Sequence, residues 1–153
     1  MTSLDIESLF TNIPVGETIE LILDKLFPDP ESIFNHFNRT LLKTLLELAV
    51  LETAFVFNGK LFKQVDGMAM DSPLGPTFGN SSMCSLEERM LDDCLLRFHP
   101  LFHSRYVDDT LVLFKGEYEA NLFLDYVNTL HPNMKFTIEK ENNCLSFLDV
   151  QVY

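Results

Sequence analysis

The sequence predicts an α+β fold in which helices cover one face of an antiparallel sheet. Two observations predict it. Short apolar runs that end at turn signals indicate strands, and amphipathic segments of helical period lie between them. Their order is strand, helices, hairpin, helix, hairpin, helix and strands. The chain of 153 residues has no internal repeat and no low-complexity linker, so residues 1–153 are expected to form one unit.

The first half is expected to hold a strand, two helices and a hairpin. Residues 3–10 begin as a strand, and because so few residues precede Asp5, the chain is expected to start inside a larger protein. Pro14 marks one helix start. Asp29-Pro30 resembles a cap with a first-turn proline, opening a helix through about Glu52. Asn58-Gly59 suits the tight turn of a hairpin formed by residues 55–57 and 60–64.

The second half continues with a loop, two helices and four strands. Residues 67–76 form a loop rich in Gly and Pro, and a helix begins between Ser72 and Pro76 and runs to about Phe98. The remaining expected elements are a hairpin over 105–114 that turns at Asp108-Asp109, a helix over 117–130, and strands over 134–140 and 144–153 joined at Asn142-Asn143.

The charge balance restricts the partners. Eleven basic and 23 acidic residues give a net charge of −12, which is the wrong sign for a protein that binds nucleic acid unaided. Metal ions or segments outside this chain would have to supply positive charge. Three cysteines without a Cys-x-x-Cys spacing favour reduced thiols, and no signal peptide or bilayer span is recognisable. The protein is therefore expected to be intracellular, in the nucleus or cytoplasm, and neither secreted nor embedded in a membrane.

Three acidic residues are candidates for chemistry. Asp108 and Asp109 lie in the middle of an apolar run, where adjacent carboxylates repel each other. A solvated turn explains them, because Asp is a common turn residue. A metal site also explains them, because divalent cations relieve the repulsion and hard oxygens suit Mg²⁺. Asp5 taken alone is better explained as a helix N-cap.

Three motifs in order carry a family resemblance. Asp5 with Phe10 resembles motif A, Gly67 to Pro76 resembles motif B, and Tyr106-Val-Asp-Asp109 resembles motif C of reverse transcriptases. Among these enzymes, the sequence is most similar to those of Penelope-like retroelements, as in Ser8-Leu-Phe-Thr-Asn-Ile-Pro14 and Leu145-Ser-Phe-Leu-Asp-Val150. The resemblance covers nearly the whole chain. It implies a polymerase palm over residues 1–153 that is truncated at both ends, with fingers and thumb largely missing.

The resemblance also implies a reaction and its cofactor. The chain would be an RNA-directed DNA polymerase that adds dNTPs to a DNA primer on an RNA template. Asp5, Asp108, Asp109 and the Ile6 carbonyl would hold two Mg²⁺ ions, for which Mn²⁺ is a possible substitute. Asp5, Asp108 and Asp109, together with Lys135 as the proton donor of motif D, would be the catalytic residues. An exposed strand lysine is an equal alternative for Lys135.

Three further residues would contact the nucleotide. Phe10 matches the steric gate that excludes the ribose 2′-hydroxyl, although one Phe among fourteen is also reasonable core packing. Gly67 and Ser72 match the loop that touches the incoming nucleotide and template, and a helix start with a Ser cap is compatible with that role. Another palm-fold enzyme, such as an RNA-templated RNA polymerase, is an alternative, but Phe10 argues against it because enzymes that use ribonucleotides keep that space open.

The sequence departs from the family at Asp71, where Gly is usual. Gly permits positive φ, and a negative charge beside the nucleotide would repel triphosphate, so Asp71 is expected to lower activity. Fingers, thumb and a GIY-YIG nuclease are expected in the full-length protein, and the isolated chain is expected to polymerise poorly. A catalytically inactive retroelement remnant that serves as a binding or structural module is the alternative function.

Two other clusters are not interpreted as sites. Cys94, His99 and His103 have metal-binding chemistry, but Pro100 interrupts helical spacing and a fourth ligand is not evident. Asp92-Asp93 shares a helix with Glu87, Glu88 and Arg89, and such a charged face is expected to be solvated.

Overall fold

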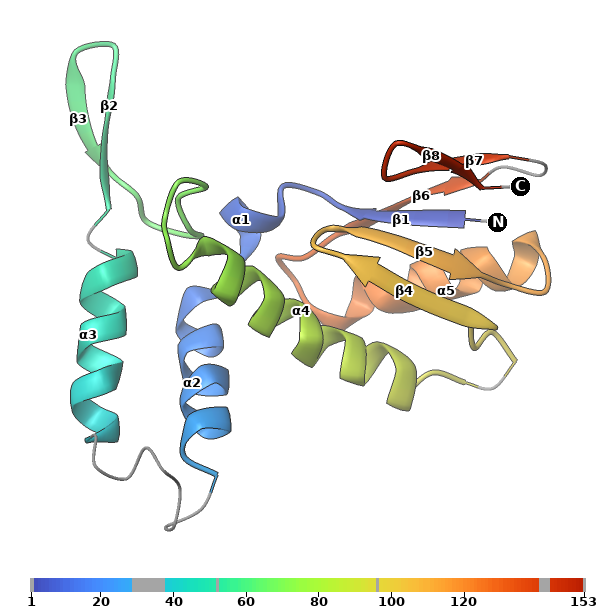
Figure 1. Cartoon of the computed structure of the whole chain (residues 1–153), viewed down its shortest axis with the longest axis horizontal. Coiled ribbons are helices and arrows are strands. Elements are labelled where there is room, and N and C mark those ends of the chain that lie inside the picture. Colours follow the sequence, from blue (N-terminus) through green and yellow to red (C-terminus); the bar gives the residue numbers. More distant parts are fainter. Residues whose placement is uncertain (1, 29–37, 52, 96, 141–143, 153) are drawn as a thin grey trace. The chain divides into compact units, whose positions relative to one another are not determined.

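Figure 1 shows the computed structural model, which describes residues 2–28, 38–51, 53–95, 97–140 and 144–152. The elements in chain order are β1 (Thr2–Ile6), α1 (Leu9–Asn12), α2 (Val15–Leu26), α3 (Arg39–Leu51), β2 (Ala54–Phe57), β3 (Lys60–Lys63), α4 (Gly75–Asp92), β4 (Phe102–Tyr106), β5 (Asp109–Leu113), α5 (Glu117–Leu130), β6 (Phe136–Lys140), β7 (Leu145–Phe147) and β8 (Val150–Val152). The chain divides into two compact units, residues 1–9 with 86–153, and residues 10–85.

The first unit contains a four-stranded sheet in the order β4-β5-β1-β6, and each neighbouring pair is antiparallel. Helix α5 runs along one face of this sheet (Figure 1). Its buried side chains are Ala120, Phe123 and Val127, and the Phe123 ring lies 5.2 Å from the Phe114 ring, centroid to centroid. This combination of helix and antiparallel sheet confirms the α+β prediction.

The two faces of the sheet differ because side chains alternate along a strand. Leu4, Val112 and Phe136 are buried on the face that α5 covers. On β1, Asp5 points to the opposite face and is exposed. The burial of Leu4 therefore fixes the direction of Asp5, because a shift by one residue would exchange the two.

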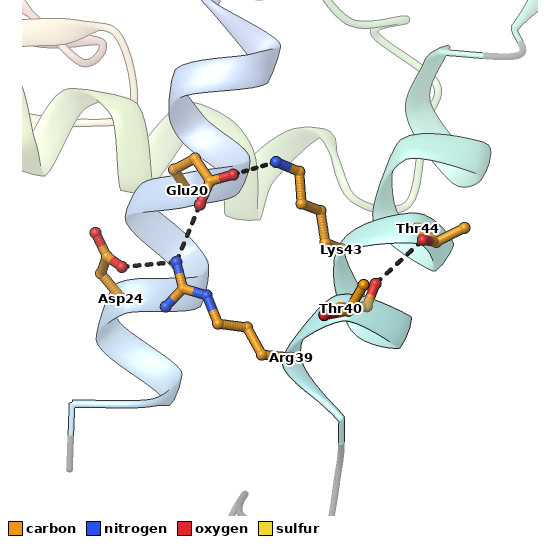
Figure 2. A network of polar contacts seen from close by, with 6 residues as sticks. All are labelled: Glu20, Asp24, Arg39, Thr40, Lys43 and Thr44. Atoms are coloured by element: carbon orange, nitrogen blue, oxygen red, sulfur yellow. Dashed lines mark hydrogen bonds and ion pairs between the residues drawn. The ribbon is translucent and has the colours of Figure 1, made fainter. Parts of the chain in front are cut away.

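In the second unit, helices α2 and α3 lie side by side and are joined by ion pairs (Figure 2). The Arg39 guanidinium donates to Glu20 at 3.0 Å and to Asp24 at 2.8 Å, and Lys43 also contacts Glu20. The predicted helix start at Pro14 is confirmed. The predicted continuous helix from Pro30 is wrong, because the Asn38 side chain accepts the Thr40 amide and caps α3 at its start. The expected cap at Asp29-Pro30 lies outside the described residues.

The β2–β3 hairpin forms as predicted, with Asn58 and Gly59 at φ values of 49° and 71°. The predicted single strand over 144–153 is wrong. That segment reverses at Leu148 and Asp149, both at positive φ, so β7 and β8 form a separate two-stranded sheet. Leu-Asp is not an Asn-Gly or Gly-containing pair, so no local turn signal indicated this reversal, although the resemblance of residues 145–150 to the family's primer-supporting hairpin region is consistent with it. The predicted join at Asn142-Asn143 lies outside the described residues.

Other boundaries are close to those predicted. Helix α4 starts at Gly75, inside the predicted interval, but it ends at Asp92 and not near Phe98 as predicted. The Phe98 amide instead donates to the Leu95 carbonyl at 3.0 Å, in a separate turn after the helix. Strand β1 ends at Ile6, and β6 begins at Phe136. None of the helices in the described ranges combines the length and apolarity that a bilayer crossing requires.

Candidate active site

The first carboxylate and the later acidic pair meet on the exposed face of the four-stranded sheet. Strands β1 and β5 are antiparallel, with Leu4 opposite Thr110 and Ser3 opposite Leu111. Continuing this register by one residue would place Asp5 opposite Asp109, and the charge of Asp5 does act on the Asp109 carboxyl. Paired residues share a face, so these two side chains emerge on the same side, away from the buried Leu4 and Thr110.

Asp108 lies in the turn that joins β4 to β5. The turn residues are Val107 and Asp108, because Tyr106 pairs with Asp109. The observed turn therefore lies one residue before the predicted Asp108-Asp109 turn, and Asp109 is the first residue of β5. Val107 has a φ of 58° while Asp108 does not share the positive φ, the pattern of a type II′ turn. Gly is the common residue at the first central position of a type II′ turn, so the β-branched Val107 is strained there.

The acids crowd one another electrostatically. The pKa of Asp109 is raised above its ordinary value, first by partial burial and then by the charges of Asp108, Asp5 and Glu139. Glu139 lies on β6 opposite Ser3, the β1 residue on the same face as Asp5. Sequence reasoning missed Glu139, since a single Glu in an amphipathic strand gives no signal. Four acidic side chains therefore share one region of the sheet.

The donor chemistry of this region fits divalent cations. Carboxylate oxygens are hard ligands, and a cation would relieve the repulsion that raises the Asp109 pKa. The side chains are not arranged as a finished cage, because within the described residues no three His, Cys, Asp or Glu side chains are placed to share one ion. The acids are electrostatic neighbours that would have to converge further to coordinate metal.

The other two predicted residues of this unit lie near the end of β1. Ile6 is buried and pairs with Phe136, so only its backbone could serve as a ligand. Lys135 is exposed, and its ammonium donates to the Asn128 carbonyl at 2.9 Å near the C-terminal end of α5. A cation is favourable at a helix C-terminus, so this contact gives Lys135 a structural partner beside its expected catalytic role.

Phe10 and Gly67 come together in the second unit. The Met68 amide donates to the Phe10 carbonyl at 2.7 Å. Gly67 has a φ of 68°, and a Cβ there would stand 2.2 Å from the Thr11 carbonyl oxygen. The loop therefore requires Gly at this position, both for its backbone conformation and for its close approach to the chain beside Phe10. The half-buried Phe10 ring also approaches Gly75.

Ser72 stabilises the loop before α4. Its amide donates to the Ala69 carbonyl at 3.0 Å, and its hydroxyl accepts the Leu74 amide at 3.3 Å. The hydroxyl thus closes a turn three residues before the helix instead of capping the helix itself. Asp71 is exposed and its φ is not positive, so the expected backbone need for Gly at this position is not observed.

Two clusters set aside on sequence grounds contain unexpected contacts. Glu87 was expected on a solvated face, but its side chain is only 16% exposed and forms an ion pair with Arg105. The expectation was wrong for Glu87, whereas Glu88, Arg89, Asp92 and Asp93 are exposed. His103 places its Nε2 atom 3.6 Å from Glu87. Periodicity along a helix cannot show which strand residue will face it, so the Glu87–Arg105 pair left no sequence signal.

Comparison with known proteins identifies similar folds and sequences. Residues 1–147 match the family described as reverse transcriptase (RNA-dependent DNA polymerase). The structure is similar to that of apo telomerase from Candida tropicalis truncated from its C-terminal domain, with a TM-score of 0.65 and 10% identity. The similarity covers 99% of this chain and 33% of the telomerase chain, and at this identity it indicates a shared fold. No curated protein sequence matches the chain.

Proposed function

This chain belongs to the reverse transcriptase family, and on that premise we propose that it is the catalytic palm of an RNA-directed DNA polymerase of the Penelope-like kind. The observation that supports the proposal is that Asp5, distant in the sequence, and Asp108 both lie close enough to Asp109 for their charges to raise its pKa. Its substrates would be dNTPs and a DNA primer annealed to an RNA template, inside the nucleus or cytoplasm.

The carboxylates have a defined task in this proposal. Asp5, Asp108, Asp109 and the Ile6 carbonyl would hold two Mg²⁺ ions, or Mn²⁺ in their place. When bound, such ions activate the primer 3′-hydroxyl and neutralise charge on the triphosphate and the leaving pyrophosphate. The chain's own contribution is to hold acidic oxygens on a rigid sheet, where they align the two reacting groups.

Phe10, Gly67, Ser72 and Lys135 would act on the substrates. The Phe10 ring would lie under the sugar and exclude a 2′-hydroxyl by overlap. Gly67 lets the backbone of its loop approach closely without a side chain, and Ser72 keeps the adjoining turn ordered. Lys135 would give a proton to pyrophosphate after releasing the Asn128 carbonyl.

Primer extension tests the proposal. The protein, with any flanking segments of its reading frame, is given a DNA primer, an RNA template and dNTPs in Mg²⁺. Extension should fall at least about a hundredfold in Asp108→Asn, because the loss of one carboxylate would weaken the binding of the Mg²⁺ ions that neutralise charge in the transition state. Asp125→Asn, on an exposed position of α5, is the matched control and should extend normally. Equal extension by wild type and Asp108→Asn would reject the assignment.

The alternative is a catalytically inactive retroelement remnant that serves as a binding or structural module. The acidic residue at position 71 favours it, because a negative charge near a triphosphate site weakens binding. A wild-type protein that binds primer-template but does not extend it in either Mg²⁺ or Mn²⁺ would select this alternative.

A further inference from the structure

Arg105 connects helix α4 to the turn that carries Asp108. Its Nε and Nη2 atoms donate to the two carboxylate oxygens of Glu87 at 2.8 Å and 3.0 Å, a bidentate pair. Its Nη1 atom donates to the Val107 carbonyl at 2.8 Å. One guanidinium therefore joins a helix side chain to the backbone of the turn, and all these residues lie in the first unit.

The hydrogen bond to the Val107 carbonyl acts on the central peptide of the turn. It belongs to the peptide unit between Val107, at a φ of 58°, and Asp108. In a two-residue hairpin, rotation of this central peptide plane interconverts the II′ and I′ turns and brings the second turn residue to positive φ. Such a rotation would redirect the Asp108 side chain. A donor fixed on the Val107 oxygen opposes the rotation.

The ion pair is costly for a purely structural contact. The side chains of Arg105 and Glu87 are 9% and 16% exposed, so both charges have lost most of their hydration. Buried ion pairs of this kind are often no more stabilising than apolar residues of similar size, and their best-attested use is to specify one arrangement. The planar fork of Arg is suited to that use, because it binds two partners in fixed directions.

His103 lies beside the Glu87–Arg105 ion pair. Its side chain is 13% exposed, and its Nε2 atom is buried without a hydrogen bond, 3.6 Å from Glu87. Burial lowers the pKa of His103, although the charge of Glu87 opposes this and that of Arg105 adds to it. A neutral His103 leaves the Glu87 carboxylate to Arg105.

We propose that Arg105 is a positioning residue for Asp108: it holds the Val107–Asp108 peptide in the strained II′ turn, and Glu87 holds Arg105. The consequence for metal binding rests on the proposed function, whereas the consequence for the turn does not. Arg105 itself would touch neither substrate nor metal.

The first test measures the turn alone. Amide hydrogen exchange is followed at Asp109, the β5 residue that pairs with Tyr106 across the turn. In Arg105→Lys, which keeps the charge but loses the fork, exchange at Asp109 should become about tenfold faster than in wild type. The control is Arg89→Lys, since Arg89 also donates to a backbone carbonyl, that of Leu130, away from the turn. An unchanged exchange rate in Arg105→Lys would overturn the proposal.

The second test separates positioning from stability. The double variant Glu87→Met, Arg105→Met removes both buried charges and keeps apolar stems, so its Tm should equal or exceed that of wild type. Mn²⁺ affinity, measured by electron paramagnetic resonance, should nevertheless fall about tenfold, as it does when an outer-shell partner of a metal ligand is lost. If the double variant binds Mn²⁺ as tightly as wild type and its Asp109 amide exchanges at the wild-type rate, the Glu87–Arg105 pair is merely structural and the proposal is overturned.

The two tests also distinguish this proposal from the proposed function. If wild type binds no Mn²⁺ and extends no primer, the polymerase assignment fails. Faster exchange at Asp109 in Arg105→Lys would still support the positioning role, and unchanged exchange would still overturn it.

Discussion

Asp5 and Asp109 each follow the Leu4–Thr110 pair by one residue on the neighbouring antiparallel strands β1 and β5, where continuation of the register places them opposite each other. The charge of Asp5 is among the causes that raise the pKa of Asp109, after partial burial and the charge of Asp108. The fold therefore brings like charges together instead of separating them. This arrangement is unfavourable without cations, and its cost has measurable consequences.

The first prediction concerns Asp109 and pH. A carboxyl whose pKa is raised on folding binds more protons in the folded state, so stability falls as pH rises from the ordinary value of 3.8 through the raised value. In chelator at pH 7, Asp109→Asn should therefore have a higher Tm than wild type and a flatter pH dependence above 3.8. Thermal unfolding across pH measures both. A variant that is less stable than wild type at pH 7 would contradict the electrostatic account.

The second prediction concerns metal addition. Mg²⁺ or Mn²⁺ should raise the Tm of wild type, because a ligand that binds only the folded state stabilises it by about 1.4 kcal/mol at ten times its Kd. The shift should be much smaller in Asp5→Asn, which removes one of the acids around Asp109. Asp66→Asn, an exposed acid in the other unit, serves as control. An equal shift in wild type and Asp5→Asn would exclude Asp5 as a ligand.

The third prediction concerns the loop of the second unit. Gly67→Ala should lower the free energy of unfolding by at least about 2 kcal/mol, because the residue adopts a left-handed φ and its Cβ would overlap backbone atoms of Thr11. Gly16→Ala in α2 is the matched control, since a Cβ there meets nothing within 4 Å. It should stabilise the protein by about 0.5 kcal/mol. Denaturant unfolding measures both, and a neutral Gly67→Ala would show that the loop can move away.

The sequence predicted those elements whose signals are local. Helix α5 shows a continuous amphipathic period, and the β2–β3 hairpin turns at Asn-Gly, the strongest short-range turn signal. The local pattern did not predict the turn at Leu148-Asp149, because Leu rarely adopts a left-handed φ and the pair contains no Gly or Asn. For the site, motif order pointed to Asp5, Asp108 and Asp109, but Glu139 and the Glu87–Arg105 pair depend on which strand faces which element, and no local pattern records that.

The fourth prediction concerns sugar selection. If the Phe10 ring is the steric gate, Phe10→Val should raise the ratio of ribonucleotide to deoxynucleotide incorporation at least about tenfold, since a smaller side chain leaves room for the 2′-hydroxyl. The measurement is single-nucleotide extension with matched rNTP and dNTP. Phe55→Val, at an exposed position of β2, is the control. A Phe10 variant with unchanged selectivity would leave Phe10 as a packing residue.

The fifth prediction isolates the charge of Asp71. Its φ is not positive, so Gly is not required there for the backbone, and only the electrostatic reason for lowered activity survives. An unfavourable interaction of about 0.5–1 kcal/mol with the triphosphate corresponds to a two- to fivefold loss of binding. Asp71→Gly and Asp71→Asn should then raise primer extension equally at low dNTP concentration, and the gain should shrink at high ionic strength. A gain in Asp71→Gly alone would return the explanation to backbone flexibility, and no gain in either would remove Asp71 from the site.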